Sequence, residues 1–443
     1  MNQDLSLSTH VLLAPRRAGL VAGQANVVDV LVRIQAPDAP AGHAAERPPQ
    51  ALALVLDRSG SMAGRPLLEA RRCAEYVLRT LRPGDAASIV EFDHRVRRLW
   101  PAVPVGDGAG QRLALAGVRA GGNTNLHGGW REGADTLADV AGSGLKRVIL
   151  LSDGQANEGV VDVAEIAAQC ARWAVQGITT STYGLGDAFN ETLMVAMAEA
   201  GGGNHYYGDT ADDLMEPFEQ ELQLLGNLAL REIELVAMPR EGIEVTMTSP
   251  HPAHEGGWRL PDLAWGAEAW AVLQLRVPAG LLPPQGRLLQ VLRVQVRARD
   301  LQGDAVELER AGLALPVLAP GPWQALQEDE LVGRRMAELA AAEAMTAMRA
   351  AAGEGDWARV EELLAEARER FGGNPWLAAI LGAMQDLATH RQREKFSKEA
   401  LYSSRKMGLR LSARDESPAL DAAGDRTPAF LRRKPAQGKA DSR

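Results

Sequence analysis

An acid and two serines, Asp57, Ser59 and Ser61, alternate with other residues directly after an apolar run at 51–56. The run has the length and composition of a buried strand, so the three oxygen-bearing side chains would line a tight turn at its end. Side chains of this kind suit a hard divalent cation. The same pattern also fits an ordinary turn with a helix N-cap, because Asp and Ser are preferred there.

Two further oxygen-bearing segments follow along the chain. Gly-Gly-Asn-Thr-Asn-Leu at 121–126 contains Thr124, and Leu-Leu-Ser-Asp-Gly at 150–154 contains Asp153. In doubly wound folds the ligand crevice lies at the carboxyl ends of parallel strands, so we expect these segments to meet the first turn there. A site of carboxylates and hydroxyls without nitrogen or sulfur donors favours Mg²⁺ or Mn²⁺, and it leaves one position open for a partner's carboxylate.

The segments that must position this site alternate between short apolar runs and amphipathic stretches. The runs lie at 51–56, 87–92, 148–151 and 178–183, and the stretches with helical spacing lie at 65–81, 126–140, 161–176, 189–200 and 210–225. Such alternation is typical of βαβ units around a parallel sheet. We therefore predict a doubly wound, Rossmann-like α/β domain over residues 50–226.

On both sides of this domain, apolar residues recur at every second position, as they do in half-buried strands. This alternation is found at 27–34, 243–247 and 292–299. In the first of these strands the apolar side consists of Val28, Val30, Val32 and Ile34. The first strand has no evident partner before residue 50, so we expect residues 1–45 and 227–320 to form one discontinuous β-sandwich that contains the α/β domain as an insertion.

The remainder of the chain is predicted to be mostly helical. Helical spacing recurs at 324–352, 356–371 and 375–390, which indicates a hairpin or small bundle within a helical region at 324–411. Residues 412–443 are rich in Pro, Gly, Ser and charges of both signs, and we expect them to be disordered.

Charge and composition exclude several classes of protein. Of the net charge of −9, residues 391–443 contribute an excess of Lys and Arg, so the rest of the chain is strongly acidic and would repel nucleic acid. The basic segment 391–411 is a candidate for binding RNA, an anionic surface or an acidic partner, although such a run is more often a solvated helix face. No run approaches the roughly 18 apolar residues of a membrane span.

The beginning of the chain and its cysteines indicate a cellular compartment. The N-terminus lacks a basic region followed by an apolar one, so no signal peptide is expected. Cys73 and Cys170 lie far apart, which excludes a disulfide framework and a Cys-rich zinc site. We therefore expect a cytoplasmic protein.

Three motifs, in this order, resemble the metal-ion-dependent adhesion site of von Willebrand factor type A domains: Asp-Arg-Ser-Gly-Ser at 57–61, Gly-Gly-Asn-Thr-Asn-Leu at 121–126 and Ser-Asp-Gly at 152–154. The resemblance extends over about residues 50–226. It implies that the ligands of a bound Mg²⁺, Mn²⁺ or Ca²⁺, directly or through water, are Asp57, Ser59, Ser61, Thr124 and Asp153. It also implies that the domain binds a partner's Asp or Glu through the metal, without catalysis.

The strands that flank the domain resemble those of bacterial relatives of inter-alpha-trypsin inhibitor heavy chains and calcium-activated chloride channel-like proteins. Extracellular members of that group carry signal peptides and disulfides, so their absence here favours an adaptor role in an intracellular assembly. In relatives, such domains accompany MoxR-type AAA+ ATPases, kinase and phosphatase modules, or bacterial defence and stress systems. The resemblance therefore implies a partner protein from one of these classes.

Two other functions remain open at this point. One is a hydrolase in which the metal activates water, with Asp93 or His127 as the nearest candidates for a general base. The other is a structural scaffold that acts through its C-terminal helices. A zinc site built from His94, His127 and His205 is disfavoured because their spacing matches no zinc pattern.

Overall fold

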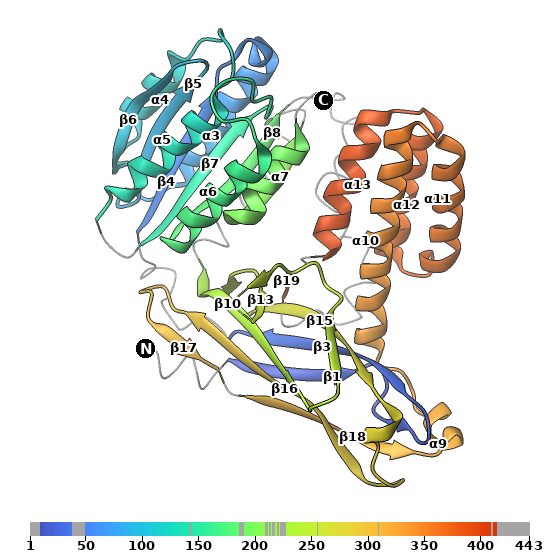
Figure 1. Ribbon diagram of the computed structural model, residues 1–443. Coiled ribbons are helices and arrows are strands. Elements are labelled where there is room, and N and C mark those ends of the chain that lie inside the picture. The colour runs from blue at the N-terminus through green and yellow to red at the C-terminus, as the bar shows by residue number, and fades with distance from the viewer. Residues whose placement is uncertain are drawn as a thin grey trace, which may run out of the picture. The chain divides into compact units, whose positions relative to one another are not determined.

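The chain divides into two compact units in its computed structural model (Figure 1). Among the residues that the structure describes, those within 9–37 and 227–413 form one, here called the two-sheet unit, and those within 49–221 form the other, here called the α/β unit. The residues that the structure describes are 9–37, 49–141, 144–185, 190–208, 211, 214, 218, 221, 227–254, 256–308, 310–408 and 411–413.

Within its described residues, the α/β unit contains a six-stranded sheet with the order β6-β5-β4-β7-β8-β9. These strands are β4 (Gln50–Asp57), β5 (Ala86–Phe92), β6 (Val96–Pro104), β7 (Leu145–Ser152), β8 (Ile178–Leu185) and β9 (Gly202–Gly208). Neighbouring strands run parallel except at one edge, where β6 pairs antiparallel to β5. The predicted parallel α/β sheet is thus confirmed, with an antiparallel strand added at its edge.

Helices alternate with these strands along the chain. They are α3 (Arg65–Thr80), α4 (Ala109–Ala116), α5 (Leu126–Ala138), α6 (Val163–Val175) and α7 (Glu191–Ala200). Apolar side chains of α5, α6 and α7 join those of β4, β5 and β7 in one buried cluster, as their spacing of three and four residues predicts. Within it, the buried indole N–H of Trp130 donates to Oγ1 of Thr180 at 2.9 Å.

Three elements of this unit, β6, α4 and β9, are not among those predicted from sequence. β6 contains two prolines and two arginines, which edge strands tolerate but which obscure the pattern of a buried strand. α4 is only eight residues long, too short for a clear helical period. The helix predicted over 210–225 is described only at positions 211, 214, 218 and 221, which are helical.

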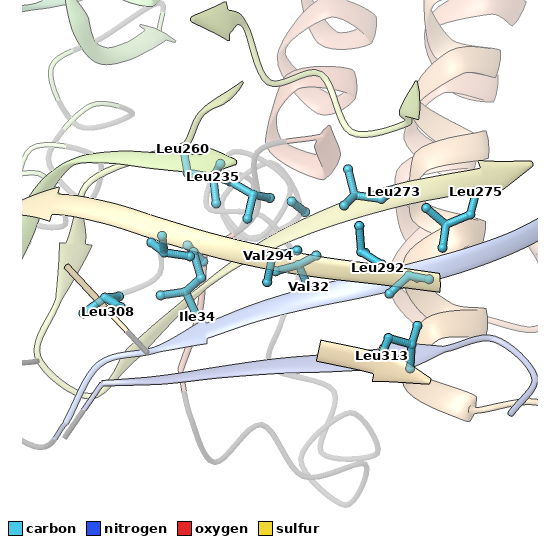
Figure 2. Close-up of a cluster of buried hydrophobic side chains, with 14 of the residues drawn as sticks. Val32, Ile34, Leu235, Leu260, Leu273, Leu275, Leu292, Val294, Leu308 and Leu313 are labelled. Atoms are coloured by element: carbon cyan, nitrogen blue, oxygen red, sulfur yellow. The ribbon is translucent and has the colours of Figure 1, made fainter. Parts of the chain in front are cut away.

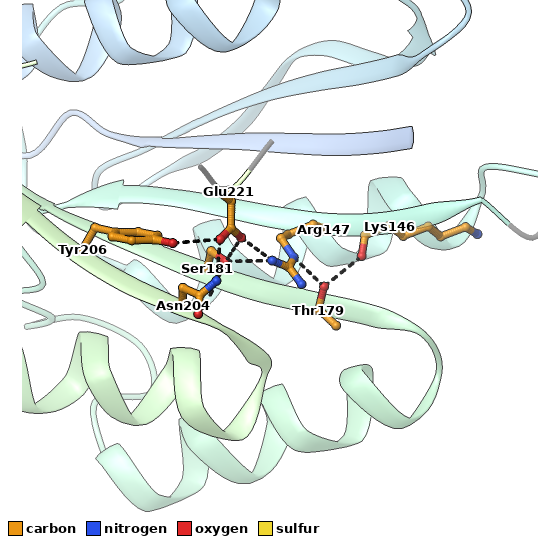
Figure 3. Close-up of polar contacts among 7 residues, drawn as sticks. All are labelled: Lys146, Arg147, Thr179, Ser181, Asn204, Tyr206 and Glu221. Carbon is orange, nitrogen blue, oxygen red and sulfur yellow. Dashed lines mark hydrogen bonds and ion pairs between the residues drawn. The ribbon is translucent and has the colours of Figure 1, made fainter. Parts of the chain in front are cut away.

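A buried ion pair fastens this last helical segment to the sheet (Figure 3). Arg147 of β7 and Glu221 are 2% and 1% exposed, and their side chains are paired. Glu221 also accepts hydrogen bonds from Ser181 Oγ at 2.6 Å, from Asn204 and from Tyr206. Burial by itself would raise the pKa of Glu221, but Arg147, Ser181 and Asn204 hold this pKa below its usual value. The Glu221 carboxylate is therefore charged.

The two-sheet unit contains two further sheets. In its described residues, the first sheet has the order β1-β3-β15-β11, and β19 also pairs with β15. The second sheet has the order β12-β13-β10-β16-β18-β2, with β14 also paired to β10 and β17 to β16. The first sheet consists of β1 (His10–Pro15), β3 (Asn26–Gln35), β11 (Glu244–Met247), β15 (Ala267–Val277) and β19 (Leu411–Ala413). The second consists of β2 (Leu20–Val21), β10 (Leu228–Pro239), β12 (Ala253–His254), β13 (Gly257–Arg259), β14 (Leu263–Ala264), β16 (Leu288–Arg299), β17 (Ala305–Glu307) and β18 (Ala311–Leu318).

The two sheets face one another across a single hydrophobic core (Figure 2). The four residues predicted to form the apolar side of the first strand, Val28, Val30, Val32 and Ile34, all lie in this core. The expectation that this strand has no partner before residue 50 is wrong, because β1 pairs with β3 in antiparallel register. On its other side β3 pairs with β15, so strands from before and after the α/β unit share one sheet.

The C-terminal part is helical, as predicted. Its helices are α9 (Pro320–Gln324), α10 (Glu330–Glu354), α11 (Trp357–Phe371), α12 (Pro375–Thr389) and α13 (Arg393–Gly408). Val332 and Leu339 of α10 pack on Leu31, Trp270 and Val272, which point away from the core between the two sheets. The bundle therefore covers the outer face of the β3–β15 pair. Among the described residues, no helix combines the length and apolar character needed to cross a membrane.

Residues at the end of the helical region depart from the predicted boundaries. Leu411–Ala413 form β19 and pair with Ala267–Ala269 of β15, although residues 412 and 413 were expected to belong to a disordered tail. The rest of that tail, 414–443, lies outside the described residues.

Candidate metal centre

The topology of the α/β sheet brings Asp57 and Asp153 to neighbouring strand ends. Asp57 is the last residue of β4, Asp153 follows the last residue of β7, and these two strands pair in parallel. β4 lies between β5 and β7: the strands that follow β4 directly in the chain, β5 and β6, lie on one side of it, and the later strands β7, β8 and β9 lie on the other. Such a reversal of strand order is where open α/β sheets place their ligand crevice.

Asp57 is fully buried, and both of its carboxylate oxygens are held by hydrogen bonds. The backbone N–H of Ser59 donates to Oδ1 at 2.8 Å, and the hydroxyl of Ser152 donates to Oδ2 at 2.6 Å. Burial raises the pKa of Asp57 to about 6, against the lowering effect of these hydrogen bonds and with a smaller contribution from the charge of Asp153. A carboxylate this poorly solvated favours a nearby cation.

Ser59 and Ser61 lie side by side in the turn after Asp57. Their hydroxyl oxygens are 3.1 Å apart, with Ser59 buried and Ser61 exposed. A short 3₁₀ helix, η1 (Gly60–Met62), begins here, and no side-chain hydrogen bond caps it. These serine side chains therefore do not act as the ordinary N-cap that the sequence also allowed.

The loop that carries Thr124 is bonded to both of the other loops. The backbone N–H of Gly60 donates to the carbonyl of Gly122 at 3.0 Å. Thr124 itself is buried, and its N–H donates to Oδ1 of Asn157 at 2.8 Å. The Thr124 carbonyl accepts from the N–H of Asn157 at 3.1 Å and from the N–H of Glu158 at 3.2 Å. These bonds join the loop to the segment that follows Asp153.

Asp153 begins the third loop and is 6% exposed. Its Oδ1 accepts from the N–H of Gln155 at 3.2 Å, and its carbonyl accepts from the N–H of Asn190 at 2.7 Å, just before α7. Gly154 follows with φ of +67°, a conformation that suits glycine. The loop thus turns sharply, with its second residue fixed by Ser152 through a bond of 2.8 Å to the Gly154 N–H.

The structure therefore joins the three segments predicted to meet, and their side chains supply two carboxylates and three hydroxyls. Within the described part of the chain, no group of three or more His, Cys, Asp and Glu side chains has the geometry of a metal site. The donors are oxygens only, which fits Mg²⁺, Mn²⁺ or Ca²⁺ better than a metal that prefers nitrogen or sulfur.

The histidines considered for zinc have separate partners. His94 Nδ1 lies 3.3 Å from Asp93 Oδ1, His127 Nε2 lies 2.9 Å from Gln169 Oε1, and His205 Nδ1 lies 2.9 Å from Thr182 Oγ1. These contacts belong to different elements of the unit, so the three side chains are not joined in one cluster.

Two polar residues near the candidate ligands take local roles. Asn125 caps α5 by accepting from the N–H of Gly128 at 2.9 Å. Asp93 forms an ion pair with Arg58 at 2.7 Å. Asp187, an acid that follows the strand predicted at 178–183, lies outside the described residues.

Two contributors to this centre escape prediction from sequence. Ser152 stands inside the Ser-Asp-Gly motif, but only the parallel pairing of β4 and β7 reveals its bond to Asp57. Asn157 is bonded to Thr124 from a loop with no regular pattern, so no sequence signal points to it. Ser152 thus orients the carboxylate of Asp57, and Asn157 holds the backbone of Thr124.

The basic C-terminal segment is largely an internal helix. Phe396, Ala400 and Met407 of α13 are buried, and so are Lys398 and Glu399. The predicted solvated basic face is therefore interrupted by charged residues that pack inside the bundle.

The sheet order and the oxygen donors together define an α/β domain with a candidate cation site at its switch point. The family model for the von Willebrand factor type A domain matches residues 51–220, and the chain contains such a domain.

Two curated relatives match less than half of the chain. The chain is 28% identical over 194 residues to the uncharacterized protein sll0103 of Synechocystis sp., an alignment that covers 43% of this chain and 45% of that protein. It is 29% identical over 202 residues to inter-alpha-trypsin inhibitor heavy chain H1 of Mesocricetus auratus, covering 42% of this chain and 21% of the relative. The chain thus matches less than half the length of either relative.

A solved structure shares the fold over most of the chain. The structure described as von Willebrand factor type A from Catenulispora acidiphila superposes with a TM-score of 0.63 at 17% identity, covering 86% of this chain and 91% of its own. At this identity the match establishes a common fold, including both units.

Proposed function

We propose that this protein is an interaction module that binds an acidic side chain of a partner protein through a divalent metal ion, Mg²⁺ first and Mn²⁺ or Ca²⁺ as alternatives. The proposed metal ligands, directly or through water, are Asp57, Ser59, Ser61, Thr124 and Asp153. One observation carries the proposal: hydrogen bonds join the three loops that bear these residues, and Asp57 is buried among them.

Each group has a defined part in this proposal. The carboxylates of Asp57 and Asp153 supply negative charge, and the hydroxyls of Ser59, Ser61 and Thr124 supply neutral oxygens. The two carboxylates only neutralise a divalent ion, and these five side chains leave part of its shell of about six oxygens open, where a carboxylate oxygen from outside can bind. Gly60, Gly122 and Asn123 are exposed beside the site, so small side chains surround the position where a partner would approach.

Binding is favoured over hydrolysis because the candidate bases are already engaged. Asp93 is paired with Arg58 at 2.7 Å, and His127 Nε2 contacts Gln169 at 2.9 Å. The scaffold alternative has no comparable support, since the helices α10 to α13 bury their apolar residues against one another and against the β3–β15 pair. We therefore propose a protein without catalytic activity.

The setting is part of the same proposal. We propose a cytoplasmic bacterial assembly, with an AAA+ ATPase or a kinase or phosphatase module as the class of partner. The domain boundaries proposed for it are 50–226 for the metal-binding domain, 1–45 with 227–320 for a β-sandwich and 324–411 for the helical region.

The first test is direct metal binding. Isothermal titration of the full chain with MnCl₂ and MgCl₂ is expected to give one site in the wild type and none in Asp57→Ala. Asp135→Ala is a matched control, because Asp135 on α5 has a partly exposed carboxylate whose ion pair is with Arg131 of the same helix, away from the three loops. A wild type that binds neither metal contradicts the proposal.

The second test concerns the partner. Capture on immobilised wild type with Mg²⁺ should retain proteins that are lost with EDTA and lost on Asp57→Ala, as identified by mass spectrometry. Their binding should then be abolished when a single Asp or Glu of the captured protein is replaced by Ala. Partners retained under all conditions would show that the contact does not involve the metal.

A further inference from the structure

Arg58, the residue between Asp57 and Ser59, contacts the end of β5 and the loop that carries Thr124. Its N–H donates to the carbonyl of Phe92 at 2.8 Å, and its carbonyl accepts from the N–H of Gly121 at 2.8 Å. Its side-chain Nη1 donates to the carbonyl of Arg119 at 3.1 Å. One residue of the first loop thus holds the end of β5 and the loop that leads to Thr124.

The guanidinium of Arg58 also forms a buried ion pair. Its Nη2 lies 2.7 Å from Asp93 Oδ2, with the two side chains 17% and 3% exposed, and its Nε lies 3.5 Å from Glu91 Oε1. Asp93 is fixed from its other side, because Oδ1 accepts from the N–H of Arg95 at 2.6 Å. The Arg58–Asp93 pair is therefore held in one orientation.

Asp93 carries this link onward to the Thr124 loop. Its carbonyl accepts from the N–H of Asn125 at 2.8 Å, directly after Thr124. Gly122 of the same loop has φ of +81°, and a Cβ there would lie 2.9 Å from Asp93 Oδ2 and 2.3 Å from His94 Nδ1. The backbone of the loop thus lies against the ion pair, and glycine allows this approach.

We propose that Arg58 is a positioning residue of the metal centre: its ion pair with Asp93 holds the turn that carries Ser59 and Ser61 against the loop that carries Thr124. This role rests on the proposed metal binding. Without the pair, the hydroxyl groups on the two loops lose their fixed separation, and the site must be reassembled each time a metal binds. Residues that orient ligands in this way commonly contribute about 10–100-fold to metal affinity.

The sign of the effect separates positioning from plain electrostatics. Arg58 places a positive charge beside a site for a cation, so Coulomb's law alone predicts tighter metal binding when that charge is removed. Positioning predicts the opposite. In the double variant Arg58→Ala/Asp93→Ala the net charge is unchanged, so electrostatics predicts little effect and positioning predicts a loss.

The test is isothermal titration of the full chain with MnCl₂. The double variant Arg58→Ala/Asp93→Ala is expected to bind Mn²⁺ about 10–100-fold more weakly than the wild type. The matched control is Arg98→Ala/Glu132→Ala, which removes another ion pair, of 2.8 Å, between β6 and α5 without touching the three loops. This control should keep the wild-type affinity.

Wild-type or tighter Mn²⁺ affinity in the double variant would overturn the proposal. If the double variant lacks the circular dichroism of the folded chain, Arg58→Lys decides, because it keeps the charge but replaces the two guanidinium nitrogens that contact Asp93 and the Arg119 carbonyl with a single nitrogen. That variant should bind several-fold more weakly, and unchanged affinity would again overturn the role of Arg58. If the wild type and the control both fail to bind Mn²⁺, the proposed metal binding itself is wrong. A loss confined to the Arg58 variants is a different result and supports the role of Arg58.

Discussion

The hydroxyl of Ser152 donates a hydrogen bond of 2.6 Å to Oδ2 of Asp57, across the carboxyl ends of β7 and β4. Since the N–H of Ser59 occupies Oδ1 at 2.8 Å, the carboxylate of Asp57 has a fixed orientation before any ligand arrives. A ligand group that is fixed in advance loses less conformational freedom on binding. Ser152 thus supports the candidate metal centre by orienting Asp57, one of the proposed metal ligands.

Replacing Ser152 by Ala should weaken Mn²⁺ binding by about tenfold, because Asp57 loses the donor that orients it. The change is measured by isothermal titration at pH 7.5. Ser88→Ala is the matched control, since Ser88 is a buried strand serine of the same sheet whose hydroxyl contacts Thr136 at 2.8 Å. Equal losses in both variants would show a general effect of removing a buried hydroxyl.

Gly122→Ala should lower both stability and Mn²⁺ affinity. The residue has φ of +81°, and the added Cβ would meet His94 and Asp93 at distances below 3.0 Å. Gly177→Ala separates the two effects, because Gly177 has φ of +82° with nothing within 4 Å of the added atom. Both variants should lose about 1–2 kcal/mol from backbone strain, as measured by urea unfolding, and only Gly122→Ala should change the titration with MnCl₂. A normal Mn²⁺ affinity in Gly122→Ala would contradict this account.

Local patterns were sufficient to predict the central strands and the three loops of the candidate site. β4 contains the continuous apolar run 51–56 and β7 the run 148–151, β5 and β8 mix apolar with polar residues, and period-two alternation identified β3 with its inward residues. The site residues stand at the ends of such runs, where a parallel sheet leaves little choice of position. That part of the fold depends on short-range patterns, which a single sequence displays.

The features that were missed depend on contacts between distant segments. The partner of β3 is β1, whose six residues, 10–15, show no alternation of polar and apolar side chains. The bonds from Ser152 to Asp57 and from Asn157 to Thr124 link residues 95 and 33 positions apart. The charged residues of α13 read as a solvated face, yet Lys398 and Glu399 are buried. No local pattern encodes such pairings.

Glu221→Gln should destabilise the α/β unit strongly. The substitution leaves the guanidinium of Arg147 buried without its carboxylate, which commonly costs about 3–5 kcal/mol. Glu132→Gln is the control, because Glu132 forms an ion pair with Arg98 in which both side chains are at least 30% exposed, and such pairs contribute about 0–1 kcal/mol. The difference should appear as an earlier unfolding transition in urea for Glu221→Gln alone. Similar midpoints for the two variants would contradict a structural role for the buried pair.

His251 should make the two-sheet unit less stable in mild acid. The side chain is buried, with Nε2 3.0 Å from the carbonyl of Trp270, and burial lowers its pKa to about 4, to which the positive charge of Arg335 adds. The unfolded chain binds a proton on this histidine below about pH 6.5, whereas the folded chain does so only below about pH 4. Its contribution to stability is therefore lost progressively as the pH falls from about 6.5 to about 4, and is constant outside this window.

The measurement is urea unfolding of the full chain at several pH values between 4.5 and 7.5, followed by tryptophan fluorescence, for the wild type and for His251→Gln. The amide of glutamine can still donate to the Trp270 carbonyl but does not titrate, so the variant should lack this component, whose upper bound is on the order of 3 kcal/mol. His254→Gln, at an exposed histidine of β12, should follow the wild type. Identical pH profiles for the wild type and His251→Gln would show that His251 does not resist protonation in the folded state.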